Sequence, residues 1–133
     1  VRNTDESLLR IAEARIAEHL AELAAAENVR ITTRSLARFE PVEFDESVVS
    51  IVESTIDERG HTGRRLPSGA GHDAQMLARV CPTAMIFTQS HLGISHNPAE
   101  HTDPDDLVAG TNLLLDVMWK LAHHDFGDER ESM

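Results

Sequence analysis

The stretch Leu66-Pro67-Ser68-Gly69-Ala70-Gly71-His72-Asp73 places small residues directly before a histidine and a short apolar segment. Small residues let the backbone approach a ligand closely, and free N–H groups at a helix start favour an anion or a developing oxyanion. His72 stands at that point, where an imidazole can donate to a carboxylate or to a polarised carbonyl. The same pattern is also typical of a glycine-rich turn with a capping histidine, so the stretch alone leaves both interpretations open.

A second loop runs from Gln89 to Thr102 and contains the sequence HLGISHNPAEHT. It follows the apolar run Thr83–Thr88, which is consistent with a buried strand. Because ligands gather beyond the carboxyl ends of strands in α/β sheets, an imidazole of this loop is a candidate metal ligand. One histidine makes no metal site, which usually needs three or more ligands. The alternative is a loop histidine held by hydrogen bonds.

Periodicity and capping residues around these loops predict further elements. A helix is expected over residues 4–27, with Thr4 as cap and Asn28 as stop, and a half-solvated strand over residues 29–39. Further helices are expected over residues 45–59 and from Asp103 onward, and the tail 127–133 should fray. The expected buried residues are Leu9, Ala12, Ile16, Leu20 and Leu23, then Val48, Val52, Thr55 and Ile56, and finally Leu107, Thr111, Leu114, Met118 and Leu121.

The resulting order of elements is an α/β pattern with too few strands for a self-contained doubly wound sheet. A domain boundary is expected near Pro41, where the alternating pattern breaks. The chain begins with Val1 rather than Met, almost at a helix cap, and therefore reads as if entered halfway through a structural unit.

Composition excludes several classes of function. The 133 residues carry 12 basic and 23 acidic side chains, a formal net charge of -11, which argues against a nucleic-acid partner. No run of about 18 apolar residues predicts a membrane span, and the first residues do not resemble a secretory signal, so a cytoplasmic protein is expected. The single cysteine, Cys81, excludes an internal disulfide framework and a multi-cysteine zinc site. It is expected to be small and buried.

Two segments together resemble one enzyme family: Leu66 to Leu77 (LPSGAGHDAQML) and Gly93 to Thr102 (GISHNPAEHT). This family is the N-carbamoyl-L-amino acid amidohydrolases, which include L-carbamoylases, beta-ureidopropionases and allantoate amidohydrolases, within the dinuclear metallopeptidase-like amidohydrolases. The opening Val1–Asp5 (VRNTD) is similar to the end of a strand in the family's lid domain. The resemblance covers essentially the whole chain.

The resemblance implies roles for the residues that match its motifs. His96 matches the last metal-ligand histidine, and His72 matches the histidine that contacts substrate and supports the polarised amide. The backbone of Gly69, Ala70 and Gly71 matches the stretch lining the substrate carboxylate. Arg2 matches the lid-domain arginine that pairs with that carboxylate, and a guanidinium fork suits a planar carboxylate.

The resemblance also implies what this chain lacks. Two divalent ions, zinc or manganese, are expected in the parent enzyme, with His96 as the one ligand supplied here. The other ligands and the general-base glutamate would lie in an N-terminal half. Residues 1–44 would then be the second half of a lid and dimerisation domain, an α+β sandwich, and residues 45–133 the closing part of a three-layer α/β catalytic domain. The expected parent is a cytoplasmic homodimer that binds a small ureido acid, and this C-terminal fragment alone is expected to be inactive.

Three other interpretations stay open. A sister dinuclear peptidase would cleave dipeptides instead of the ureido C–N bond. A non-catalytic dimerisation or interaction module would keep only a relic of the catalytic loops. A small α/β domain with coincidental loops would need both spaced motifs to arise by chance. For a homodimer, the face bearing Arg30, Arg34 and Arg38 is expected to flank the seam.

Overall fold

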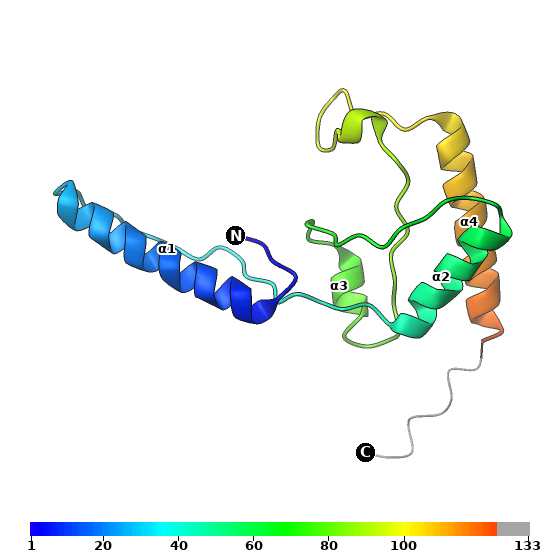
Figure 1. Cartoon of the computed structure of the whole chain (residues 1–133), viewed down its shortest axis with the longest axis horizontal. Coiled ribbons are helices and arrows are strands. Elements are labelled where there is room, and N and C mark those ends of the chain that lie inside the picture. Colours follow the sequence, from blue (N-terminus) through cyan, green and yellow to red (C-terminus); the bar gives the residue numbers. More distant parts are fainter. Residues whose placement is uncertain (125–133) are drawn as a thin grey trace, which may run out of the picture. The chain divides into compact units, whose positions relative to one another are not determined.

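The computed structural model describes residues 1–124, and the tail predicted to fray, residues 127–133, lies outside them. The described elements are α1 (Glu6–Ala26), α2 (Glu46–Glu58), α3 (Asp73–Leu77), the 3-10 turn η1 (His91–Gly93) and α4 (Pro104–Ala122), joined by extended segments (Figure 1). Within this part of the chain, no helix combines the length and the apolar character that crossing a membrane requires.

The chain divides into two compact units. The first contains Val1–Glu43 and Leu66–Gln75, and the second contains Phe44–Arg65 and the residues from Met76 onward. The division into a lid domain over residues 1–44 and a catalytic domain over residues 45–133 stays a prediction.

Local capping fixes where the helices begin and end. The side chain of Asp5, rather than the predicted Thr4, accepts a hydrogen bond from the backbone N–H of Leu8 at 3.0 Å and starts α1. Asn28 follows the last turn with a φ of 51°, the left-handed conformation that ends many helices, and is therefore the predicted stop.

The second helix is capped as its sequence predicts. The Asp45 carboxylate accepts from the backbone N–H groups of Ser47 and Val48 at 2.9 and 3.1 Å. Gly60 has a φ of 70°, and the N–H of His61 reaches back to the carbonyl of Ile56 at 3.1 Å. This pair of features is a Schellman ending, for which glycine has no steric cost.

Both predicted strands are wrong for the part of the chain that the structure describes, so its regular structure is helical rather than α/β. A strand needs hydrogen bonds to a neighbouring strand. Neither residues 29–39 nor residues 83–88 form such a ladder within residues 1–124. The backbone bond from the Asp45 N–H to the Thr83 carbonyl, at 3.1 Å, is an isolated one. Alternation in residues 29–39 and an apolar run in residues 83–88 suit an extended backbone, and both segments run as extended connections without a strand partner in the described chain (Figure 1).

The second unit has an apolar core between α2 and α4. Val52 packs with Leu113 and Val117, and all three are buried. Ala84 and Ile86 of the extended segment 83–88 pack against the same cluster but are only partly buried. Phe87 is exposed, so the segment is not the buried strand that its apolar run predicted. Thr55 is fully buried beside the core, and its hydroxyl donates to the Ile51 carbonyl at 2.6 Å.

Ion pairs tie α2 to its neighbours in the second unit. Arg59 meets Asp116 of α4 at 2.6 Å, and Lys120 of α4 meets Glu58 at 2.6 Å. Arg65, which follows α2, bonds Glu46 and Glu53 at 2.7 Å each.

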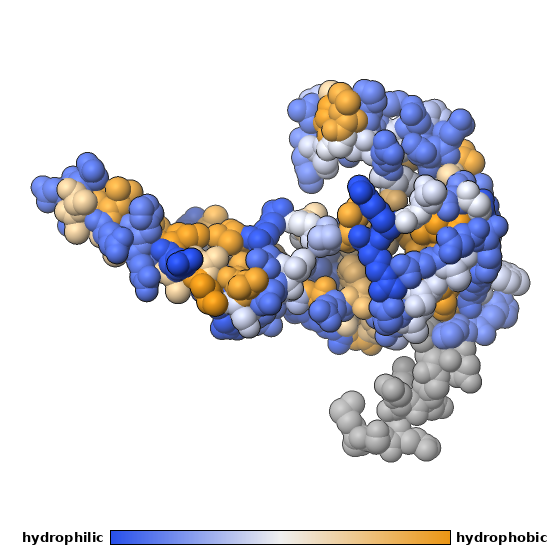
Figure 2. Space-filling model, in the orientation of Figure 1, coloured by the Kyte–Doolittle hydropathy of each residue, from blue (hydrophilic) through white to orange (hydrophobic). Residues whose placement is uncertain are grey.

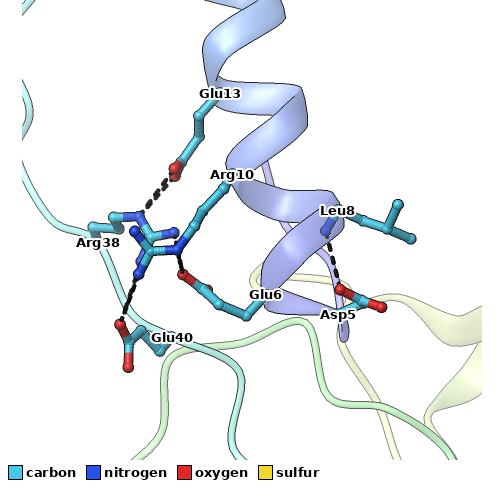
Figure 3. Close-up of polar contacts among 7 residues, drawn as sticks. All are labelled: Asp5, Glu6, Leu8, Arg10, Glu13, Arg38 and Glu40. Atoms are coloured by element: carbon cyan, nitrogen blue, oxygen red, sulfur yellow. Dashed lines mark hydrogen bonds and ion pairs between the residues drawn. The ribbon is translucent and has the colours of Figure 1, made fainter.

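In the first unit, α1 holds the extended segment 29–40 through charged side chains (Figure 3). Arg38 donates to Glu6 at 2.8 Å and to both oxygens of Glu13 at 3.0 Å, and these bonds raise the pKa of Arg38 above its ordinary value. Arg10 also bonds Glu6, at 2.6 Å, and reaches Glu40 at 3.4 Å. Arg38 is therefore engaged within its own unit.

The predicted buried stripe of α1 is confirmed only in part. Leu9 is buried and Leu20 is half-buried, whereas Ile16 and Leu23 are exposed. Apolar side chains consequently lie on the surface of α1 (Figure 2).

Candidate functional site

Arg2 and Gly69, far apart in the sequence, lie against each other in the first unit. A Cβ built on Gly69 would stand 3.7 Å from Nη1 and 4.0 Å from Cδ of Arg2. Within residues 1–124 the Arg2 guanidinium makes no ion pair or hydrogen bond. A guanidinium presents five donors and stays charged at ordinary pH. Arg2 can therefore bind an anion next to the backbone at Gly69.

The backbone of residues 69–71 leaves donors free beside that guanidinium. The N–H of Ala70 is engaged by the hydroxyl of Ser68 at 3.3 Å. Within the described residues, the N–H groups of Gly69 and Gly71 have no partner. A Cβ on Gly71 would meet nothing within 4 Å, so the backbone there is open. The three predicted carboxylate-binding residues thus divide into two with free donors and one, Ala70, whose donor is used.

His72 is the cap of α3, which is one of the two interpretations that the sequence leaves open. The ring Nδ1 of His72 accepts from the backbone N–H of Ala74 at 3.2 Å. The backbone N–H of His72 donates to the side-chain Oε1 of Gln75 at 3.3 Å. This reciprocal arrangement is a capping box with histidine in the place of serine or threonine. The N–H of Ala74 is therefore not free for an anion, contrary to the expectation for this helix start.

The cap has a chemical consequence for the imidazole. Because Nδ1 acts as an acceptor, the neutral ring carries its proton on Nε2. The Nε2–H of His72 is then a donor directed by the helix cap, and no described residue uses it. Capping and donation to a ligand are compatible roles for the two nitrogens of one ring.

His96 belongs to the second unit and lies in a loop braced by hydrogen bonds. The N–H of His91 donates to the carbonyl of His101 at 2.7 Å, which closes the base of the loop. The N–H of His96 itself donates to the Glu100 carboxylate at 2.8 Å. His96 has a φ of 55°, an uncommon conformation for a residue with a side chain.

The described residues do not make a complete metal site. Residues 1–124 gather no group of three or more His, Cys, Asp or Glu side chains suited to an ion. The donor chemistry of His96 suits zinc or manganese, but one imidazole is too few for either.

Two contacts of the candidate residues, one in each unit, were not predicted from the sequence. Gln75 lies three residues after His72, which is the capping-box spacing, so this signal was present. Glu100 lies four residues after His96, and no pattern in the sequence predicts that its carboxylate folds back onto that backbone.

Comparisons with known proteins place these loops in context. The sequence profile of peptidase family M20/M25/M40 matches residues 6–120. The N-carbamoyl-L-amino acid amidohydrolase of Geobacillus stearothermophilus is 39% identical over 107 residues, which cover 80% of this chain and 26% of that protein. The allantoate amidohydrolase of Bacillus subtilis (strain 168) is 39% identical over 95 residues, which cover 71% of this chain and 23% of that protein.

A solved structure agrees with these relatives. The hydantoinase/carbamoylase family amidase from Burkholderia vietnamiensis superposes with a TM-score of 0.83 at 35% identity, covering 90% of this chain and 29% of that one. The chain thus spans about a quarter of the length of the curated relatives it matches, 26% and 23% for the two named here. The resemblance to N-carbamoyl-L-amino acid amidohydrolases is confirmed, and the chain belongs to peptidase family M20/M25/M40.

Proposed function

We propose that this chain supplies the carboxylate-binding part of an amidohydrolase that cleaves the ureido C–N bond of N-carbamoyl-L-amino acids or related ureido acids. The observation that carries the proposal is the unpartnered guanidinium of Arg2 beside Gly69. Relatives named for N-carbamoyl amino acids and allantoate, whose substrates carry carboxylates, support it.

The first step is recognition of the substrate's carboxylate. Arg2 offers two parallel N–H donors, and the free N–H groups of Gly69 and Gly71 add further donors. Charge-assisted bonds of this kind are stronger than neutral ones and fix orientation. Holding the carboxylate at Arg2 positions the ureido group for reaction.

The second step is stabilisation of charge on the ureido carbonyl oxygen. The Nε2–H of His72 donates to that oxygen as it becomes negative during attack by water. The helix cap holds the ring in the required tautomer, so the donor is in place before the reaction begins. His72 is therefore the catalytic residue that we assign in this chain.

We assign His96 as one metal ligand. The resemblance implies two divalent ions, zinc or manganese, but the described residues lack the remaining ligands. We propose that those ligands and the general base come from protein outside this chain, in agreement with the 26% of the Geobacillus enzyme that it spans. The chain alone is then expected to be inactive, because we assign the general base to none of its described residues.

A second candidate is cleavage of small peptides, which the name of the matching family favours. It shares the carboxylate-binding step and differs in the bond that is cleaved.

A homodimer is also proposed. Arg38 is paired with Glu6 and Glu13 within its own unit. Of the three arginines expected beside the dimer interface, we therefore assign that place to Arg30 and Arg34.

A chimera tests the function. The matching segment of the Geobacillus enzyme is replaced by residues 1–124, and hydrolysis of N-carbamoyl-L-amino acids is compared with hydrolysis of dipeptides. We expect N-carbamoyl substrates to be cleaved, and Arg2→Ala to raise KM while the matched exposed variant Arg15→Ala does not. A chimera that unfolds cooperatively yet cleaves only dipeptides supports the peptidase alternative. One that cleaves neither contradicts both.

A further inference from the structure

The loop around His96 forces that residue into a backbone conformation that needs support. A φ of 55° brings Cβ close to the following carbonyl, which costs free energy for any residue other than glycine. Neighbouring Leu92 and Gly93 also have positive φ, at 56° and 68°. Something in the loop must therefore hold His96 in place.

The turn after His96 is built by its own residues. The side chain of Asn97 accepts from the N–H of Ala99 at 2.9 Å, and its carbonyl accepts from the N–H of Glu100 at 2.9 Å. Pro98 occupies the second position of this turn, where its fixed φ is favourable. The turn brings Glu100 back alongside His96.

Glu100 is the side chain that bonds His96. Its Oε2 accepts from the His96 N–H at 2.8 Å, a charge-assisted bond to the backbone of the strained residue. The bond can form only when the chain between the two residues is turned. It therefore couples the conformation of His96 to the presence of an acceptor at residue 100.

We propose that Glu100 is a positioning residue, which holds the backbone of His96 in the left-handed conformation and so sets the direction in which its side chain leaves the chain. The importance of that direction rests on the proposed function, in which His96 is a ligand. The positioning itself is a property of this chain and can be measured without metal or substrate.

The test uses the isotope-labelled chain and solution NMR. Removing the acceptor with Glu100→Ala should speed hydrogen exchange at the His96 amide by about tenfold, the effect of losing one hydrogen bond. The Cα chemical shift of His96 should also move away from its left-handed value. Glu100→Gln keeps an acceptor oxygen and should restore both signals. Asp57→Ala, which removes an exposed carboxylate from α2, serves as the matched control and should change neither.

Two results would overturn the proposal. One is a His96 amide in Glu100→Ala that exchanges as in the unaltered chain. The other is faster exchange spread across α2 and α4, which marks global destabilisation rather than local release. The chimera separates this proposal from the proposed function. If the unaltered chimera fails to hydrolyse ureido acids while the NMR result holds, the function fails and the positioning role stands.

Discussion

Arg2 lies against Gly69, since a Cβ on Gly69 would lie 3.7 Å from the Arg2 Nη1. The φ of Gly69 is outside the left-handed region, so its backbone conformation does not require glycine. A Cβ there would make only an ordinary contact with the guanidinium. Under the proposed function, however, the space that this Cβ would fill is where a carboxylate oxygen binds.

Gly69→Ala should therefore affect binding more than folding. The added methyl makes an ordinary contact with Arg2, so the free energy of unfolding should change by less than about 0.5 kcal/mol. Binding of an N-carbamoyl amino acid to the chimera should weaken on the order of tenfold, because bonds to the carboxylate are lost. Gly71→Ala, where the methyl meets open space, is the control and should weaken binding less. Equal affinities for both variants and the parent would refute this account of Gly69.

His72 should be found as a single tautomer. Because its Nδ1 accepts from the Ala74 N–H at 3.2 Å, nitrogen-15 NMR above the pKa of imidazole should show the proton on Nε2. His19 lies exposed on α1 with no described partner and should show the mixture of a free imidazole. A mixture at His72 like that at His19 would mean that the cap does not select the donor.

Gly110 should be intolerant of a side chain. A Cβ there would collide with the Thr88 methyl group where α4 packs against the segment 83–88. Overpacking costs typically about 1–3 kcal/mol, and the better helix propensity of alanine recovers up to about 1 kcal/mol. Denaturant unfolding of Gly110→Ala should therefore show a net loss of stability.

Thr88→Ser supplies the matched test of that collision, because it removes the methyl group that Gly110→Ala would strike. The double variant should recover most of the stability lost by Gly110→Ala alone. If the loss of stability in the double variant equals the sum of the losses in the two single variants, the two residues do not contact each other.

The acid sensitivity of the second unit should depend on Arg65. Its hydrogen bonds lower the pKa values of Glu46 and Glu53 below their ordinary 4.5. Lowered carboxylate pKa values stabilise the fold fully above that ordinary value, and the contribution is lost as pH falls through the folded pKa. Between about pH 5 and 3, at low salt, the free energy of unfolding should therefore decrease less in Arg65→Gln than in the unaltered chain. Arg64→Gln is the control, because it removes a neighbouring charge that has no described partner, and it should leave the acid profile of the unaltered chain unchanged. Acid profiles of the two variants that coincide would contradict the assignment.

Helix ends could be predicted because their signals are local. Asp45 and Gly60 bound α2 as their residue types require, and Pro104 begins α4. Strands depend on partners far away in sequence. Neither the alternation over residues 29–39 nor the apolar run over residues 83–88 says whether a partner is present. The helices were therefore predictable from this chain, and the sheet was not confirmed.

The buried face of α4 shows the same limit. Leu114 and Met118 were expected inside but are exposed, whereas Leu113 and Val117 are buried against α2. Apolar residues lie on both faces of this helix, so periodicity alone could not select one. Cys81 was likewise expected to be buried and is exposed. Packing partners, rather than local sequence, decide such positions.

Two contacts of the candidate residues agree with motifs in the sequence, whereas the roles of these residues stay predictions. The capping position of His72 follows from its spacing to the next helix, and the approach of Arg2 to Gly69 agrees with the resemblance. The contact between Glu100 and His96 depends on the path of a turn, which residue types alone do not fix.

The most direct test of the carboxylate-binding claim is NMR titration of this chain with an N-carbamoyl-L-amino acid and with the same compound converted to its carboxamide. The account predicts that the free acid shifts the Arg2 guanidinium and the Gly69 and Gly71 amide signals, and that the carboxamide leaves them nearly unchanged. Equal shifts with both compounds, or shifts that survive Arg2→Ala, would contradict it.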